Sequence, residues 1–179
     1  MIRLFAAVAV PPELGKGLQH RQSGLAGARW RPLEAFHITL RFFGELREDV
    51  ADDLHLELER LSAAPMTLEL EGVGSFGEGP DLHAVWAGVK ENPALRRLAK
   101  ACETAARRAG LAADGRAYRP HVTLAYLRHP DPAEVAAWLS ANALLKSPPF
   151  EVTRFGLYAS QLLSGGSQYQ LEQIYRLRP

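Results

Sequence analysis

The stretch F-H-I-T-L-R-F-F-G-E-L, residues 36–46, places a histidine and a threonine two positions apart inside an apolar run. The stretch P-H-V-T-L-A-Y-L, residues 120–127, repeats this arrangement in the second half of the chain. Six histidines and five threonines placed at random in 179 residues would give about 0.17 H-x-T pairs. Two pairs are present and each is followed by leucine, so the doubled H-x-T-L motif is the strongest signal in the sequence.

Alternation along a β-strand predicts where the motif side chains point. His37 and Thr39 share one face of their strand, and His121 and Thr123 share a face in the same way. The apolar residues between and after them are expected to face the core. The histidines and threonines are therefore predicted to face a cleft or solvent.

The elements around the two motifs predict an α+β fold rather than a doubly wound parallel sheet, because strands and helices interleave and several strands form hairpin-like, antiparallel pairs. The order of elements suggests two similar halves, each a sheet backed by helices. Four helices are predicted from apolar periodicity and from proline, aspartate and glycine at their ends, at residues 11–25, 47–64, 92–110 and 131–144. The predicted strands are residues 3–10, 28–33, 35–44, 66–77, 81–89, 118–127, 150–160 and 167–177.

The composition excludes several classes of protein. A length of 179 residues suits one compact domain or two small lobes that share a core. A net charge of +1 is too small for a general nucleic-acid binder. The single cysteine, Cys102, excludes a disulfide framework and a cysteine-based metal site and is expected to be a buried thiol. No apolar stretch is long enough to cross a membrane. The short apolar stretch near the N-terminus, residues 3–10, is interpreted as a buried strand rather than a signal peptide. A cytoplasmic protein is therefore expected.

Acid–base catalysis fits the doubled motif better than metal binding or nucleophilic catalysis does. A metal site of this kind usually needs a third histidine or a carboxylate, and neither motif contains one. A serine triad is also disfavoured, because the chain has no G-x-S-x-G elbow. Two imidazoles can instead act as a neutral base and a charged acid, while threonine hydroxyls donate hydrogen bonds to a phosphate between them.

Positive charge near the motifs could help to bind that phosphate. Strand alternation places Arg41 on the face of His37 and Arg119 on the face of His121. It also places Phe43 on the site face, where the ring could stack on a base, although a core position is equally consistent with the sequence. Two further arginines, Arg29 and Arg31, precede the first motif, and phosphate contact and simple solvent exposure explain them equally well.

The chain resembles the two-histidine (2H) phosphoesterases, specifically the RNA 2′,3′-cyclic phosphodiesterases, which are also named 2′-5′ RNA ligases. The resemblance covers most of the chain and rests on the segments at residues 4–14, 29–46, 119–127 and 155–171, which include both H-x-T-L motifs. It implies a single bilobal α+β domain over residues 1–179. Two antiparallel sheets would form a central cleft in a pseudo-two-fold arrangement, with helices packed outside and one motif in each lobe.

The resemblance also implies an activity and a role for each motif residue. A terminal RNA 2′,3′-cyclic phosphate would be hydrolysed to a 2′-phosphate without metal or other cofactor, and the reverse reaction would join RNA ends through a 2′-5′ bond. His37 would donate a proton to the leaving 3′ oxygen, and His121 would accept one from water. Thr39 and Thr123 would hold the phosphate. The implied partner is RNA with a cyclic phosphate end, with tRNA fragments as candidates, and the protein is expected to be a monomer that does not bind membranes.

One departure from the family pattern concerns the residue that clamps the phosphate. The family often has an arginine two residues beyond the second motif, where this chain has Tyr126, and Arg128 follows two residues later. In a regular strand both would point away from the face of His121. Three alternatives follow: Arg119 clamps the phosphate, Arg128 does so if the strand turns, or the phosphate is held with less positive charge than in the family.

Two other functions remain open from the sequence. A 2H phosphoesterase could act on a small cyclic nucleotide or an ADP-ribose derivative instead of an RNA end. A non-catalytic module could bind nucleotides or RNA ends, although binding alone would not require a histidine in both motifs.

Overall fold

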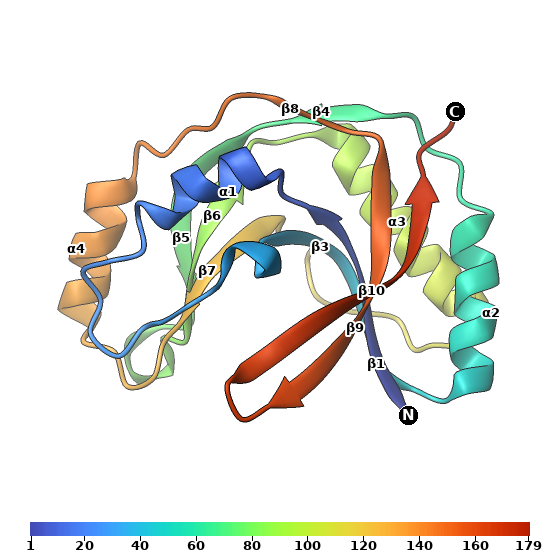
Figure 1. Cartoon of the computed structure of the whole chain (residues 1–179), viewed down its shortest axis with the longest axis horizontal. Helices are drawn as coiled ribbons and strands as arrows, with labels where there is room; N and C mark the ends of the chain where they lie inside the picture. Colours follow the sequence, from blue (N-terminus) through green and yellow to red (C-terminus); the bar gives the residue numbers. More distant parts are fainter.

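The computed structural model describes residues 1–179 and contains an eight-stranded antiparallel sheet with four α-helices around it (Figure 1). The strand order is β10-β9-β1-β3-β7-β6-β5, with the short strand β2 paired to β7. These strands are β1 (Ile2–Ala9), β2 (Arg29–Trp30), β3 (His37–Leu46), β5 (Leu70–Phe76), β6 (Ala84–Val89), β7 (His121–Tyr126), β9 (Arg154–Leu163) and β10 (Gly166–Arg176). A second sheet pairs β4 (Met66–Leu68) with β8 (Phe150–Val152). The predicted α+β class with antiparallel sheets is confirmed.

The large sheet consists of two halves that meet at a single residue pair. One half is β10-β9-β1-β3 and the other is β7-β6-β5. Between β3 and β7 the only paired residues are Ile38 and Val122, the middle residues of the two H-x-T motifs. The strands diverge on either side of this pair, so the two motifs lie where the two halves of the sheet separate.

The helices are α1 (Pro12–Gln19), α2 (Glu48–Glu59), α3 (Pro93–Arg108) and α4 (Pro132–Asn142). Figure 1 shows α2 and α3 at one end of the molecule and α4 at the other. Helix α3 buries Leu95, Leu98, Cys102 and Ala106, whose spacing of three and four residues forms a single apolar face. Capping matches the sequence signals, because the Asn92 and Asp131 side chains accept backbone N–H groups at the starts of α3 and α4.

Several predicted elements are shorter or divided in the structure. The strands expected over 66–77 and 150–160 are each divided between the small sheet and the large one. Two other elements are shortened to about half or less of their predicted length. The helix expected over 11–25 ends at Gln19, and the chain beyond it turns through Gly24 and Gly27, both with positive φ. The strand expected over 28–33 is limited to Arg29–Trp30, because Pro32 has no N–H for a ladder and leads into a 3-10 turn at Leu33–Ala35.

The β9–β10 hairpin extends beyond the helices and crosses the front of the molecule in Figure 1. Its tip reaches the segment before the first motif, since a Cβ atom on Gly166 would lie 2.6 Å from a guanidinium nitrogen of Arg29. The hairpin therefore closes one side of the region that contains the two motifs. None of the four helices is long and apolar enough to span a membrane.

Candidate active site

The Ile38–Val122 pair brings the two motifs together with local two-fold symmetry. Both side chains are fully buried, at 0 % exposure, so they point into the core. Side chains alternate along each strand, so the neighbouring histidines and threonines all point to the opposite face. In an antiparallel pair with this register, His37 lies beside Thr123 and Thr39 lies beside His121. Residues from distant parts of the sequence thus form one cluster of two imidazoles and two hydroxyls.

The spacing of this cluster suits a group held between the two histidines. The histidines are diagonal neighbours across the strand pair, one on each side of the Ile38–Val122 pair. A tetrahedral phosphate held in front of that pair would therefore have one imidazole on each side. The two threonine hydroxyls lie on the same face and can donate hydrogen bonds to its oxygens.

His37 lies in an aromatic pocket made by the other strands of its half-sheet. Its ring centroid is 4.5 Å from that of Tyr158, 5.6 Å from Tyr169 and 6.1 Å from Phe5. Burial in this pocket lowers the His37 pKa to about 4; the carbonyl of Ala35 opposes the shift, and the charge of Arg31 adds to it. His37 is therefore unprotonated near neutral pH when the site holds no anion.

His121 has a comparable position in the other half of the sheet, with one nitrogen fixed by the backbone. Its ring packs edge-on against Phe76 at 4.7 Å and lies 5.7 Å from Trp86. The Nδ1 atom is 2.7 Å from the carbonyl oxygen of Arg119, which can only accept, so Nδ1 carries the proton in the neutral ring. The Nε2 atom then keeps its lone pair, and burial lowers the His121 pKa, which favours this neutral form.

Two buried polar atoms have no hydrogen-bond partner, and both belong to this cluster. They are Nδ1 of His37 and Nε1 of Trp86, whose ring neighbours His121. Unsatisfied buried polar groups cost stability and are rare in folded proteins. One of the two atoms thus belongs to a motif histidine, and the other belongs to a ring that packs beside the second motif histidine.

A β-bulge in β3 makes the prediction for Arg41 wrong. Ala7 pairs with Thr39, but the next residue of β1, Ala6, pairs with Arg41, so Leu40 is an extra residue in β3. Because of this insertion, Arg41 points to the face opposite His37 and Thr39. There it forms ion pairs with Glu103 of α3 and with Asp114.

The prediction that Phe43 lies on the site face is wrong for the same reason. Beyond the first bulge Phe5 pairs with Phe42, and a second irregularity follows at Phe43, which is buried in the core. Phe42 replaces it on the site face and stacks on Phe5 at 5.8 Å with an interplanar angle of 3°. Phe5 itself is buried and stacks on both Phe42 and Tyr158, so the partly exposed rings of Phe42 and Tyr158 are the candidates for base stacking near His37.

A second bulge, in β7, changes the expected orientation of Tyr126. Trp86 pairs with Thr123 and Val85 pairs with Ala125, so Leu124 is the extra residue. Tyr126 then shares the face of His121 and Thr123, whereas a regular strand would have pointed it away. Its ring lies 5.5 Å from the guanidinium carbon of Arg31, so the residue that stands in place of the family's usual arginine contacts another arginine.

Arg31 is the cation that the sequence left undecided, and it belongs to the site. Only one charged residue is buried in the whole protein, and it is Arg31, at 8 % exposure. Its guanidinium lies over the rings of Tyr126 and Tyr169, at 5.5 and 5.3 Å, and donates a hydrogen bond to the carbonyl of Ser167 in the hairpin. No carboxylate forms an ion pair with it. A buried, unpaired guanidinium next to a histidine pair is suited to an anionic ligand.

Arg119 and Arg128 are the other two arginines that the sequence predicted as candidates to bind the phosphate. Arg119 lies over the ring of Phe76 at 6.0 Å, and its charge contributes to the lowered pKa of His121. Arg128 is exposed and lies two residues beyond the end of β7. The structure thus brings Arg31 and Arg119 to the motif residues and turns Arg41 away from them, while a role for Arg128 stays a prediction.

Comparison with known proteins decides the family. Residues 10–162 match the 2′-5′ RNA ligase superfamily. The chain belongs to this superfamily. An RNA 2′,3′-cyclic phosphodiesterase of Archaeoglobus fulgidus is 30 % identical over 97 % of this chain and 99 % of its own length. The enzyme of the same name from Escherichia coli is 30 % identical over 93 % of this chain and 92 % of its own length.

Solved structures of Escherichia coli LigT have the same overall fold. Escherichia coli LigT in complex with 3′-AMP superposes with a TM-score of 0.80 and 27 % identity, over 98 % of both chains. The same protein in complex with phosphate gives a TM-score of 0.76 at 25 % identity. The superfamily match confirms the resemblance seen in the sequence. The relatives named RNA 2′,3′-cyclic phosphodiesterase support it as well, because they align with nearly the whole chain.

Proposed function

We propose that the protein hydrolyses RNA 2′,3′-cyclic phosphate ends to 2′-phosphates through acid–base catalysis by His37 and His121. The observation that carries this proposal is the Ile38–Val122 pair, which places both histidines and both threonines on one face with local two-fold symmetry. Relatives that align along nearly the whole chain carry the name RNA 2′,3′-cyclic phosphodiesterase. We further propose that the chain works as a single bilobal domain and as a monomer, on RNA ends such as those of tRNA fragments.

The proposed reaction is an in-line displacement at the cyclic phosphorus. Nε2 of His121 accepts a proton from water, whose oxygen forms the new bond to phosphorus. The bond from phosphorus to the 3′ oxygen breaks, and His37 donates a proton to that oxygen, which leaves the phosphate on the 2′ oxygen. An in-line displacement needs the attacking and leaving oxygens on opposite sides of the phosphorus, and a phosphate between the two diagonal histidines would have one ring on each side. Thr39, Thr123 and Arg31 stabilise the charge on the remaining oxygens.

The identity of the product tests the proposal directly. A short RNA that ends in a 2′,3′-cyclic phosphate is incubated with the protein in the presence of EDTA. We expect a 2′-phosphomonoester, recognised because the product co-elutes with an authentic 2′-phosphate standard and separates from the 3′-phosphate standard. The side chains offer no group of three or more histidine, cysteine or acidic residues that could hold a metal, so we expect full activity in EDTA. A 3′-phosphate product would contradict the assigned leaving oxygen, and inhibition by EDTA would contradict a metal-independent reaction.

The pH dependence of kcat/KM gives a second test, since this quantity reports the pKa values of the free enzyme. Burial lowers the pKa of both histidines below the ordinary value of 6.5, that of His37 to about 4. The active form has one ring protonated and the other neutral, so its population is largest between the two pKa values. We therefore expect a bell-shaped profile with its maximum below pH 6.5. A maximum above pH 7 would contradict the proposed pair.

2′-5′ ligation of a cyclic end would use the same groups in the same roles, with the 5′-hydroxyl of a second RNA in place of water. His121 would accept the proton of that hydroxyl as its oxygen bonds to phosphorus, and His37 would donate a proton to the 3′ oxygen as its bond to phosphorus breaks. If the product assay shows no turnover of an RNA end, the alternative is a small cyclic nucleotide or an ADP-ribose derivative. Those substrates then become the next to assay.

A further inference from the structure

A groove of about 700 Å³ adjoins the catalytic face on the side of His37. It runs between the end of β1, the start of β9 and the end of β10, and Tyr158 forms part of its wall. Tyr158 also contacts the ring of His37, so the groove and the site share a side chain. Its volume falls in the range of about 300–1,000 Å³ that is usual for small-ligand sites.

Strand pairing shows that the groove opens on the same face as the motif residues. Ala7 of β1 pairs with Thr39 on one side and with Gly156 of β9 on the other, so Gly156 shares the face of Thr39. Arg154 precedes Gly156 by two residues and therefore points to that face as well. Burial raises the pKa of Tyr158, and the nearby charge of Arg154 partly opposes this shift, which places the arginine close to the wall shared with the site.

The groove is positively charged and its cations are not neutralised by the protein. Arg154, Arg176 and Arg178 line it, and Glu151 is the only acidic residue among its walls. None of the three arginines forms an ion pair. Arg154 and Arg176 are directly opposite each other across β9 and β10. Like charges in that arrangement destabilise a sheet, so the fold retains a repulsion that an anion would relieve.

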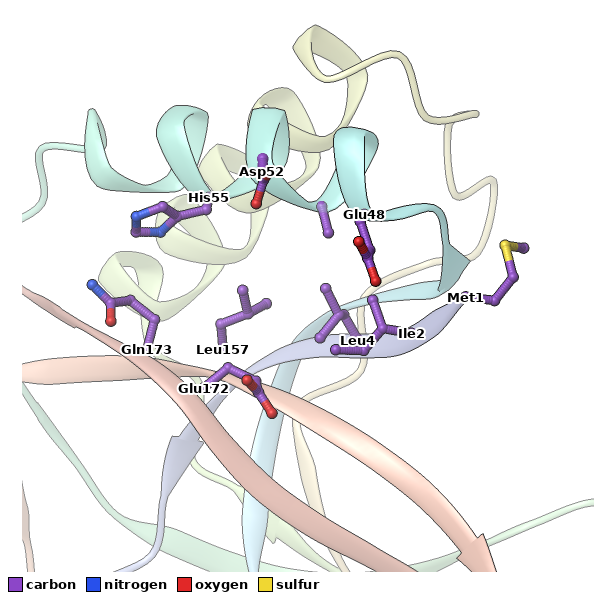
Figure 2. Close-up of a pocket in the computed structure, with 10 residues that line it drawn as sticks. Met1, Ile2, Leu4, Glu48, Asp52, His55, Leu157, Glu172 and Gln173 are labelled. Carbon is purple, nitrogen blue, oxygen red and sulfur yellow. The ribbon is translucent and has the colours of Figure 1, made fainter.

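A second hollow in the same sheet has the opposite charge and serves as a contrast. Figure 2 shows this pocket between α2 and the strands β1, β9 and β10, with the carboxylates of Glu48, Asp52 and Glu172 around it. Its apolar floor includes Leu4 and Leu157, which belong to the core face of the sheet. A polyanion would be repelled there, so of these two hollows only the arginine-lined groove suits a nucleic-acid chain.

We propose that this groove binds the backbone phosphates of the nucleotides that precede the cyclic end of the RNA. The inference rests on the proposed function and extends it, because it makes the enzyme selective for RNA ends over free cyclic mononucleotides. The cyclic phosphate lies between the histidines, the terminal nucleoside packs near Tyr158, and the chain continues past Arg154 to Arg176. Only a substrate with at least one upstream phosphate reaches these arginines.

The test compares kcat/KM on two substrates that share the same cyclic end. One is a nucleoside 2′,3′-cyclic monophosphate, and the other is a tetranucleotide that ends in the same nucleotide. We expect the double variant R154S/R176S to lower the ratio of tetranucleotide to mononucleotide kcat/KM by about tenfold, chiefly through KM of the tetranucleotide. The slope of log kcat/KM against log salt for the tetranucleotide should become about 1.4 units less negative, which is about 0.7 for each lost contact.

Two further variants show whether loss of positive charge in the groove causes the lower ratio of kcat/KM values. R154K/R176K keeps both cations and should retain most of the ratio. R97S removes an exposed, unpaired arginine from α3 and should leave the ratio as in the wild type. An unchanged ratio in R154S/R176S would overturn the groove proposal, and so would an equal loss in R154K/R176K. Turnover of neither substrate by the wild-type protein would instead overturn the proposed function, and the groove proposal with it.

Discussion

Substitution of His37 or His121 with glutamine is expected to lower kcat/KM on a cyclic RNA end by about 10²–10⁴-fold, the usual contribution of a positioned general acid or base. Glutamine keeps a polar side chain of similar reach but cannot take up or release a proton at neutral pH. Steady-state kinetics on a short RNA with a 2′,3′-cyclic phosphate measures the effect. The double variant should be little worse than either single variant, because one proton transfer without the other leaves the displacement incomplete.

His20 provides the matched control for these variants. It is exposed at the end of α1, away from both motifs, so H20Q should keep wild-type kinetics. The fold should survive in H37Q and H121Q, because Ile38 and Val122 carry the core contacts between the two halves of the sheet. A kcat/KM within threefold of the wild type for either H37Q or H121Q would rule out the two-histidine mechanism.

The sequence predicted the core of the site because the doubled motif depends only on local alternation. Between His37 and Thr39, and between His121 and Thr123, no residue is inserted, so the expected shared faces hold. The apolar Ile38 and Val122 were likewise expected in the core, where the structure buries both. Alternation over two residues needs no knowledge of the partner strand, so it can be read from the chain alone.

The prediction failed just beyond each motif, where a bulge inserts one residue. Leu40 in β3 and Leu124 in β7 follow the threonines at equivalent positions, and each reverses the alternation of the residues after it. Arg41 moves away from the site as a result, and Tyr126 moves into it. A bulge depends on how two strands pair, so a single strand sequence carries no clear signal for it.

The burial of Arg31 could not be predicted from the sequence for a different reason. The nearness of Arg31 to the first motif was visible, but its burial depends on two segments that are distant in sequence. The rings under its guanidinium belong to Tyr126 of β7 and Tyr169 of β10, and the guanidinium donates a hydrogen bond to the Ser167 carbonyl at the hairpin tip. No local pattern predicts that the hairpin folds back over the segment before β3.

Replacement of Arg31 is the second change with a large expected effect. R31Q should lower kcat/KM by about 10²–10³-fold, the range found when one donor to a developing charge is removed. R31K keeps the charge but loses the planar fork between the two tyrosines, so we expect an intermediate loss. The same steady-state assay measures both variants, with R97Q on the outer helix α3 as the control that removes one exposed arginine.

A titration of His37 separates this role of Arg31 from a purely structural one. The charge of Arg31 contributes to the lowered pKa of His37, after the larger effect of burial. The His37 pKa, followed by the NMR shift of its ring protons, should therefore rise in R31Q and stay low in R31K. Wild-type kinetics in R31Q would show that the buried guanidinium does not bind the phosphate. A loss of activity in R31Q with an unchanged His37 pKa would show instead that the arginine only holds the hairpin in place through Ser167.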